Sequence, residues 1–359
     1  MKTLVLTVCA FLLTLTVNSQ GLENVIVEKY YISDANDATV NSTGGVLPVG
    51  SVTYRVYLDL LPDYIFQAAY GDGNHECRIE TTTLFFNNED RGATTPTFSK
   101  NFCDDNTVML DSWLSVGAAC AANFGVRKIY DDGVATVVNN DGVLTNNDPL
   151  IGIPLTVQDG FLAGTPQPVT EVGITTEIAV FDAQNDGTNG PVFSTNNGSW
   201  ASLNGSSGPD PLLNEVLIAQ ITTDGIFSFQ LNVQIRNNIT SVVENYVASN
   251  PVGSEVLFPA LNYNSSTGIN DASEQTFSIG LYPNPATDVL YVRFNSLRSN
   301  GTATFKLIDM LGNVLSSREV KTTQGLSSEK FDLSQLSNGI YFLEVDQDGV
   351  RKTKKVVKH

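Results

Sequence analysis

Short segments in which apolar and polar residues alternate run through this chain and restrict it to β-structure. Residues 52–59, VTYRVYLD, place β-branched and aromatic side chains in the period-2 pattern of a half-buried strand. No window keeps a helical apolar period over a long stretch, and only residues 241–247 are compatible with a short helix. Further strands are expected at residues 80–86, 177–181, 216–222 and 227–235.

Clusters of Asn, Asp and Gly separate these segments. They occur at residues 71–74, 131–133, 140–142 and 185–187, and they supply the positive φ angles that tight turns need. Charged residues make up only 16% of the chain, below the typical value of about 25%. Many short strands with regular turns predict an all-β fold, in which residues 20–262 form an acidic antiparallel β-sandwich or jelly-roll-like domain.

A polar, aperiodic stretch at residues 263–276 is typical of a linker, and the alternation returns after it. Residues 277–359 are therefore predicted to form a small second β-sandwich with its own core. Its strands are expected at residues 289–294, 303–307, 340–345 and 352–357, with a hairpin turn at residues 311–313.

The first 19 residues combine one lysine, an apolar run and a small-residue end, which is the pattern of a secretory signal peptide cleaved after Ser19. The apolar run is too short to span a hydrocarbon core of about 30 Å. No other stretch is long and apolar enough to do so, and we expect no transmembrane segment in the mature chain.

Charge is distributed unevenly between the two predicted domains. Residues 20–276 hold 30 acidic and 8 basic residues, whereas residues 277–359 hold 8 acidic and 11 basic residues. The acidic part would repel phosphates, so no nucleic acid partner is expected. Its charge favours solubility, with cation binding as the alternative.

Motifs in the predicted second domain follow one another in a recognisable order: Tyr-Pro-Asn-Pro, a Leu-Gly hairpin, an Asn-Gly-Ile-Tyr strand and a basic end. Together they resemble the type A C-terminal sorting domain of type IX secretion substrates. The motif residues are Tyr282, Pro283, Asn284, Pro285, Leu311, Gly312, Gly339, Tyr341, Lys354, Lys355 and Lys358.

This resemblance implies a route and a set of partners. The domain would dock at the type IX translocon of a Gram-negative bacterium and be removed by a sortase-like peptidase. The rest of the chain would then be released or coupled to surface lipopolysaccharide, so that the mature protein is extracellular or on the outer-membrane surface. In physical terms, Pro283 and Pro285 stiffen the start of the domain, and the final strand presents an exposed basic edge. Lysines on such an edge also protect an ordinary strand from aggregation.

Three cysteines remain in the mature chain: Cys77, Cys103 and Cys120. In an oxidising compartment we expect one disulfide and one remaining thiol, and short loops favour either Cys103–Cys120 or Cys77–Cys103. No CxxC pair is present, which argues against a structural zinc site.

Catalytic chemistry has little support in residues 20–262. Their one histidine, His75, adjoins a predicted turn and is expected to be solvated, without the partners that a metal site needs. No GxSxG elbow is present, and acidic residues are too abundant for any pair to stand out. The sequence therefore predicts no enzyme, no catalytic residue, no cofactor-binding residue and no metal ligand.

Calcium stays open as an alternative, because Asn/Asp/Gly-rich loops offer hard oxygen ligands. Residues 182–187 depart from the EF-hand pattern, with Phe193 where a bidentate Glu belongs, and ordinary turn chemistry is the preferred interpretation. The acidic candidates are Asp131, Asp132, Asp141 and Asp148.

Two tryptophans could stack on sugar rings. Trp113 lies in an alternating apolar stretch, and Trp200 follows a turn and is the better candidate for exposure. Core or rim positions are favoured for both.

Residues 20–262 also resemble a secreted bacterial β-domain of unassigned function, through the stretches YRVY at 54–57, DSWLSVG at 111–117, GSWASL at 198–203 and LIAQITTDG at 217–225. The leading hypothesis is a non-catalytic adhesion, matrix or glycan-binding domain. The alternatives are a polysaccharide hydrolase that uses paired carboxylates and a structural domain stiffened by calcium.

Overall fold

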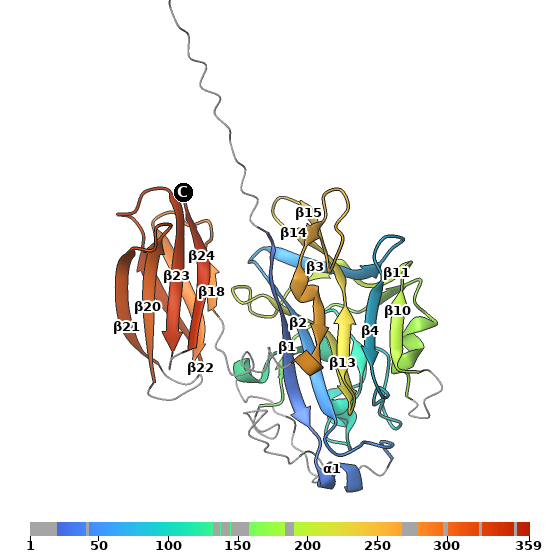
Figure 1. The fold of residues 1–359 in the computed structure, drawn as a ribbon. Helices are drawn as coiled ribbons and strands as arrows, with labels where there is room; N and C mark the ends of the chain where they lie inside the picture. The colour runs from blue at the N-terminus through green and yellow to red at the C-terminus, as the bar shows by residue number, and fades with distance from the viewer. Residues whose placement is uncertain are drawn as a thin grey trace, which may run out of the picture.

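The computed structural model describes residues 20–40, 43–131, 137, 144, 158–183, 190–267, 279–296, 301–322, 325–347 and 350–359. The predicted signal peptide at residues 1–19 lies outside them. The described chain is all-β, as predicted, and its strands form two separate bodies (Figure 1). We call the described part of residues 20–267 the N-terminal domain and that of residues 279–359 the C-terminal domain. Among the described residues, no helix is both long and apolar enough to cross a membrane.

The first sheet of the N-terminal domain has the order β1-β2-β12-β5, with neighbours antiparallel. β2 was predicted to be half-buried, but it is covered on both faces. Val56 and Leu58 face one apolar cluster and Tyr57 faces another, because loops and short strands close over the second face. The strands are β1 (Leu22–Ile32), β2 (Val52–Leu60), β5 (Trp113–Leu114) and β12 (Glu215–Thr223).

Two further sheets close the larger apolar cluster from the other side, with the orders β10-β4-β13-β17 and β16-β15-β14-β3-β11-β9. Their strands are antiparallel except for the β15–β16 pair. The bounds are β3 (Tyr64–Gly71), β4 (Cys77–Thr81), β9 (Thr170–Val172), β10 (Val192–Thr195), β11 (Gly198–Ser206), β13 (Phe227–Gln230), β14 (Asn232–Asn237), β15 (Val243–Val247), β16 (Val256–Leu257) and β17 (Asn262–Asn264).

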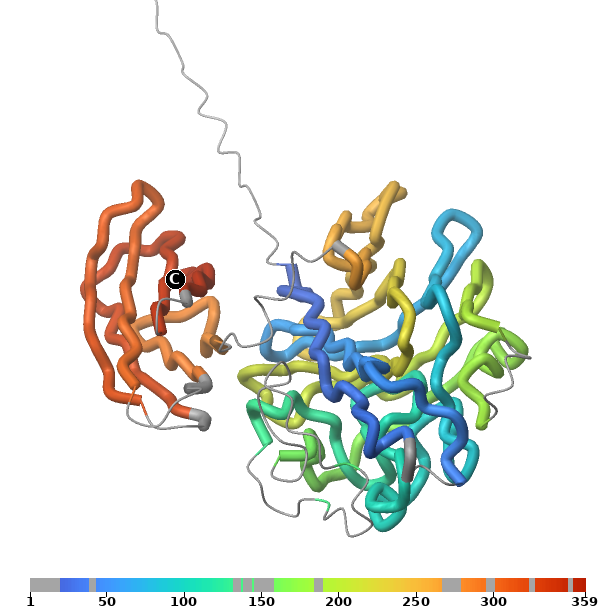
Figure 2. Tube along the Cα trace, turned by 60° about the horizontal axis from the view of Figure 1, so that its bottom comes forward, coloured from blue at the N-terminus to red at the C-terminus, as the bar shows by residue number. Residues whose placement is uncertain are grey.

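Short elements build the remainder of the domain (Figure 2). They contribute to the smaller apolar cluster together with β1, β2 and β12. A small sheet has the order β6-β7-β8. The bounds are α1 (Ala35–Val40), β6 (Ala118–Cys120), β7 (Asn123–Gly125), β8 (Phe161–Ala163) and the 3-10 helices η1 (Lys100–Phe102), η2 (Val108–Leu110), η3 (Lys128–Tyr130), η4 (Glu177–Phe181), η5 (Pro259–Leu261) and η6 (Ser265–Thr267).

Several predicted elements differ in the structure. Residues 241–247 hold strand β15 instead of a helix, and residues 177–181 form the 3-10 helix η4 instead of a strand. Only the first two residues of the strand predicted at 80–86 lie in β4. The strand predicted at 227–235 is broken at Leu231, where the chain passes from one sheet to another. Each of these outcomes depends on packing against distant segments, which outweighs local preference.

The C-terminal domain is the predicted small sandwich. Sheets β18-β19-β22 and β21-β20-β23-β24 enclose one apolar cluster, to which β19 contributes Leu290, Val292 and Phe294, and β20 contributes Ala303, Phe305 and Leu307. The strands are β18 (Ile279–Tyr282), β19 (Val289–Ser296), β20 (Gly301–Asp309), β21 (Val314–Thr322), β22 (Gly325–Asp332), β23 (Gly339–Gln347) and β24 (Val350–Lys358). The predicted linker overlaps β17 and η6, and its residues 268–276 lie outside the described part of the chain.

Candidate functional site

The Tyr-Pro-Asn-Pro segment lies against the final strand, β24. The Asn284 side chain donates to the Lys355 carbonyl at 2.8 Å and accepts from the Val357 N–H at 2.8 Å. Ala286 then continues the pairing, because its N–H donates to the Val357 carbonyl at 2.7 Å. An asparagine side chain thus acts as one rung of a strand ladder, since its amide offers both a donor and an acceptor. The peptide bonds before Pro283 and Pro285 are both cis.

Several other motif residues come to the same end of the C-terminal domain. Gly339 pairs with Lys358, and Tyr341 pairs with Asp309, the residue that precedes the β20–β21 hairpin carrying Leu311 and Gly312. The Tyr341 hydroxyl donates to the Ser337 carbonyl at 2.7 Å and closes the start of β23. Antiparallel pairing therefore brings together motifs that lie far apart in the sequence.

This hairpin exposes apolar side chains on a rigid turn. The Asp309 carboxylate accepts from the N–H groups of Leu311 and Asn313, and Gly312 adopts a φ of 86° that suits glycine. The Asn313 side chain and these N–H groups also lower the pKa of Asp309. Leu311 is 87% exposed. We call the exposed side chains of Met310, Leu311, Val314 and Leu315 the apolar hairpin. Such a patch is typical of a partner-binding surface.

The basic end of the chain was predicted to be an exposed edge, and this prediction is wrong for its lysines: Lys358 is buried, and Lys352, Lys354 and Lys355 are half-buried. The Lys358 ammonium donates to the Thr287 carbonyl at 2.7 Å. Lys354 points at the N-terminal domain, where its Nζ lies 2.7 Å from Glu23 Oε2 and 3.5 Å from Asp59 Oδ2. Burial opposes the charge of Lys354, but these two carboxylates outweigh it and raise the pKa of Lys354 above its ordinary value.

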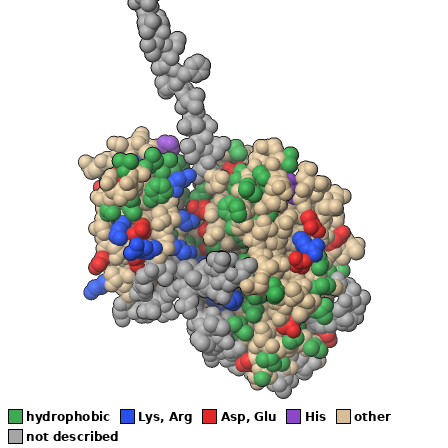
Figure 3. Space-filling view, viewed as in Figure 1, with side chains coloured by type: hydrophobic (Ala, Val, Ile, Leu, Met, Phe, Trp, Pro, Cys, Tyr) green, Lys and Arg blue, Asp and Glu red, His purple; other side chains and the backbone are tan. Residues whose placement is uncertain are grey.

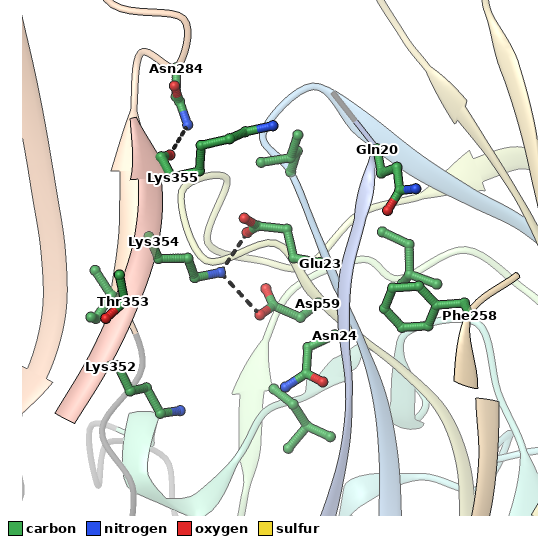
Figure 4. A pocket seen from close by; sticks show the side chains of 14 residues that line it. Gln20, Glu23, Asn24, Asp59, Phe258, Asn284, Lys352, Thr353, Lys354 and Lys355 are labelled. Carbon is green, nitrogen blue, oxygen red and sulfur yellow. Dashed lines mark hydrogen bonds and ion pairs between the residues drawn. The ribbon is translucent and has the colours of Figure 1, made fainter. Parts of the chain in front are cut away.

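A groove of about 570 Å³ separates the two domains at this contact (Figure 4). One wall comes from the start of β1, with Glu23 and Asn24, and the other from residues 352–355 of β24. A second ion pair joins the domains, because Arg293 lies 2.9 Å from Asp210. Basic side chains on one side of the boundary meet acidic ones on the other (Figure 3).

A second hollow lies on the N-terminal domain and has a volume of about 350 Å³. We call it the polar pocket. The Ser194 hydroxyl hydrogen-bonds to the Glu76 carboxylate, which also lies 3.4 Å from the Arg78 guanidinium. Hydroxyl, amide and carboxylate groups of this kind match the hydroxyl groups of a sugar. The pocket is lined by Glu76, Gly173, Glu177, Ser194, Thr195, Asn196 and Asn197.

Both tryptophans are core residues, as favoured from the sequence. Trp113 is 1% exposed, and Trp200 is fully buried in edge contact with Phe193, with ring centroids 5.7 Å apart. Trp200 is therefore not the exposed residue that its position after a turn suggested. Neither ring is available to stack on a sugar.

His75 is not the solvated residue that was predicted. It is 3% exposed, and the carboxylates of Asp72 and Glu255 face its ring. One ligand atom from each of these three residues lies within 4.8 Å of the others, so the expectation that a histidine-based site would lack partners is also wrong. Glu255 reaches His75 from a segment 180 residues further along the chain, where no sequence signal pointed to it.

Of the predicted calcium candidates, Asp131 lies within the described residues. Asp131 is buried, and its carboxylate accepts from the Gly160 N–H at 2.7 Å. Asp132, Asp141 and Asp148, like residues 184–187 of the compared EF-hand stretch, lie outside the described residues.

The cysteines occupy two different places. Cys103 and Cys120 lie in the smaller apolar cluster, where their thiols interact, and Cys77 lies in the larger one. This interaction, together with burial, raises the pKa of Cys103 well above its ordinary value. Of the two pairings left open by the sequence, only Cys103–Cys120 joins neighbours.

Sequence reasoning also missed the polar pocket and most of the apolar hairpin. Asn196 and Asn197 lie in the turn that precedes Trp200, and Glu177 was predicted to lie in a strand. A signal for the hairpin was present, because Met310 and Leu311 are apolar residues at a turn where polar residues are usual.

Comparison with known proteins gives an identity for the C-terminal domain. Residues 280–359 match the family model of the secretion system C-terminal sorting domain. These residues are a type IX sorting domain, and the chain is a substrate for export to the cell surface or extracellular space. No curated protein matches the chain.

Similarity to solved structures is low. Dimeric latent PorU from Porphyromonas gingivalis shares 17% identity over 39% of this chain and 13% of its own, with a TM-score of 0.22. A biofilm-associated protein BSP domain shares 10% identity over 96% of this chain and 53% of its own, with a TM-score of 0.20. An endonuclease/exonuclease/phosphatase from Beutenbergia cavernae shares 8% identity over 94% of this chain and 73% of its own, with a TM-score of 0.20. The chain thus spans about half or less of the length of the first two of these proteins.

Proposed function

We propose that the N-terminal domain is a non-catalytic adhesion, matrix or glycan-binding domain, delivered by the type IX sorting domain at the end of the chain. The polar pocket is its glycan site, and the composition of that pocket carries the proposal. Asn196, Asn197 and Ser194 supply amide and hydroxyl groups, and Glu76 and Glu177 supply acceptors. Sugars are recognised by such groups when they converge in a concave site.

The groups around Glu76 are held in place. Its carboxylate accepts from Ser194 and lies beside Arg78, whose guanidinium is fixed in turn by Glu80 at 2.6 Å. Pre-ordered groups lose less conformational freedom when a ligand binds. The residues that line the pocket include no aromatic side chain, so we expect modest binding of single sugars and stronger binding of polymers.

The alternative function, polysaccharide hydrolysis, has one specific observation in its favour. Glu76 and Glu177 line the same pocket, and glycosidases use two carboxyl groups across the scissile bond. A glycosidase general acid, however, usually sits in apolar surroundings, whereas Glu76 is paired with Arg78 and its side chain is 46% exposed. Binding without turnover is therefore the better supported function.

The test is binding of the purified mature chain to a polysaccharide and glycan panel, with release of reducing sugar followed in the same wells. Asn196→Ala and Asn197→Ala should each weaken binding at least tenfold. Asn101→Ala, on the exposed η1, is the matched control and should bind as the unaltered chain does. Absence of binding to every glycan contradicts the proposal. Sugar release that Glu177→Gln abolishes would instead establish the hydrolase.

Proteolytic processing of the protein after export is a separate part of the proposal. A sortase-like peptidase removes the C-terminal domain after the translocon has bound it, and the N-terminal domain is then released or joined to surface lipopolysaccharide. Mass spectrometry of the protein recovered from culture medium and from outer membranes tests this. Recovery of only the full-length chain in both fractions contradicts removal.

A further inference from the structure

His75 sits at the centre of a cluster that joins two separate segments of the N-terminal domain. It lies in the turn between β3 and β4, and its side chain is 2% exposed. Nδ1 lies 3.3 Å from Asp72 Oδ1 in the same turn. Nε2 lies 3.1 Å from the Asn250 carbonyl oxygen and 3.5 Å from Glu255 Oε2, both in the segment between β15 and β16.

This arrangement gives the ring three oxygen acceptors. A neutral imidazole has one N–H and one nitrogen lone pair. If Nδ1–H donates to Asp72, the Nε2 lone pair points at the oxygens of Asn250 and Glu255. Three sets of lone pairs then converge on one small, largely buried volume, and a positive centre is needed there to hold them together.

Each of the oxygens is held in position by backbone. Asp72 Oδ1 accepts from the N–H groups of Asn74 at 2.8 Å and His75 at 2.9 Å, so the carboxylate is fixed in the turn. Glu255 Oε2 accepts from the Val252 N–H at 2.6 Å. Asn250 has a φ of 50°, in the left-handed region, and this backbone conformation accompanies the approach of its carbonyl to the ring.

We propose that His75 Nε2, Glu255 Oε2 and the Asn250 carbonyl oxygen bind a divalent transition metal ion, with zinc as the best match. Tetrahedral zinc with bonds of about 2.0–2.1 Å places its ligand atoms about 3.3 Å apart, between the 3.1 Å and 3.5 Å separations observed here. Asp72 is the outer partner, because a carboxylate that accepts from Nδ1–H fixes the tautomer in which Nε2 binds metal.

The surroundings suit this role. Asn74 and Asn250 are exposed, so an ion can reach the site and water can fill the fourth position. The ion would tie the segment between β15 and β16 to the β3–β4 turn. Glu76, the next residue after His75, lines the polar pocket, so the ion would also hold one wall of that pocket. Metal binding itself does not depend on what the pocket recognises.

The experiment is calorimetric titration of Zn²⁺ into the mature chain after treatment with a chelator. We expect one tight site per chain. His75→Gln should weaken Zn²⁺ binding at least a hundredfold, and Asp72→Asn by about 10–100-fold, as for other outer partners of metal-binding histidines. His359→Gln is the matched control, since it makes the same change at the other histidine of the mature chain and should leave binding unaltered.

Two further measurements keep the result decisive. Circular dichroism checks the fold of each variant, and Glu255→Gln replaces His75→Gln if the latter does not fold. Zn²⁺ should also raise the melting temperature of the unaltered chain and not that of Glu255→Gln. Failure of the unaltered chain to bind Zn²⁺ overturns the proposal. Zn²⁺ binding by Glu255→Gln and Asp72→Asn that is as tight as binding by the unaltered chain also overturns it.

Discussion

The ammonium nitrogen of Lys354, in the last strand of the chain, lies 2.7 Å from the carboxylate of Glu23, in the first strand of the N-terminal domain. The same nitrogen lies 3.5 Å from Asp59, and the three side chains are between 15% and 26% exposed. The two domains, whose net charges are opposite in sign, thus meet in a partly buried ion-pair contact. The sorting domain is held against the protein that it exports.

Lys354→Ala should loosen this contact. It removes a partly buried ion pair, which we expect to contribute about 1 kcal/mol to docking. The radius of gyration from small-angle scattering should rise. Raising salt from about 0.1 M to 1 M should act in the same direction on the unaltered chain, because the Debye length falls from about 10 Å to about 3 Å. The control is Arg351→Ala, which breaks only a pair with Asp346 inside its own domain. An unchanged radius for Lys354→Ala refutes the prediction.

Lys352 should make docking depend on pH. Burial in the interface, with repulsion from Arg127, lowers the pKa of Lys352 to about 8 from an ordinary value of 10.5. Between these two values the separated domains bind more protons than the docked ones do, so docking should strengthen as pH rises from about 8 towards 10. Scattering at pH 7, 8.5 and 9.5 measures this. The radius of gyration of the unaltered chain should fall as docking strengthens. This pH dependence should vanish in Lys352→Met and persist in Lys321→Met, which alters an exposed lysine. A pH dependence of equal size in Lys352→Met assigns the effect to another group.

Asn284→Ala should destabilise the C-terminal domain by about 1–3 kcal/mol, because the partly buried Val357 N–H loses its acceptor. Hydrogen exchange at that amide should accelerate, and the unfolding midpoint should fall. Asn284→Asp keeps an oxygen acceptor for Val357 and loses only the donor to Lys355, so its effect should be smaller. Equal losses in both variants contradict the assigned role of the acceptor.

Leu311→Ser should reduce export and leave the fold intact. Leu311 is 87% exposed, so the free energy of unfolding should change by no more than about 0.5 kcal/mol. Removal of apolar surface from the apolar hairpin should weaken binding to the translocon. The fraction of protein at the surface of a bacterium with a type IX system is the readout. Leu203→Ser, at a 77% exposed leucine of the N-terminal domain, is the control. Unchanged export of Leu311→Ser excludes the hairpin as the contact.

Oxidised glutathione should convert the thiols of Cys103 and Cys120 into one disulfide, with two electrons and two protons passing to glutathione. The mass should fall by two hydrogens, and one thiol, that of Cys77, should remain. For a loop of this length we expect a stabilisation of about 3 kcal/mol. Cys77→Ala should oxidise normally, whereas Cys103→Ala should not form the intramolecular bond. Cross-linking of Cys77 to Cys103 in the unaltered chain contradicts this pairing.

In the C-terminal domain, local pattern predicted β19, β20, β23 and β24, but not β18, β21 or β22. The alternation of apolar and polar residues in β19 and β20 agrees with the face that is buried, because successive side chains of a strand point to opposite sides. The hairpin at residues 311–313 was also predictable, since its turn is stabilised by Asp309 and Gly312 within a few residues. Local pattern failed where sheets are joined. Leu231 separates β13 from β14 because its N–H donates to the carbonyl of Leu261, thirty residues away.

The sequence by itself determined the all-β class, the acidic and basic halves and the identity of the sorting domain, because each is encoded in composition or in residues close together along the chain. Only the tertiary structure decided which polar groups are buried and what they face. His75 adjoins a turn, yet a segment about 180 residues away covers it and supplies Glu255. The sequence predicted that Lys354 lies on an exposed basic edge, but in the structure Glu23 of the N-terminal domain lies beside it. Burial and charge pairing depend on contacts between distant segments, and the spacing of apolar residues along the sequence does not predict such contacts.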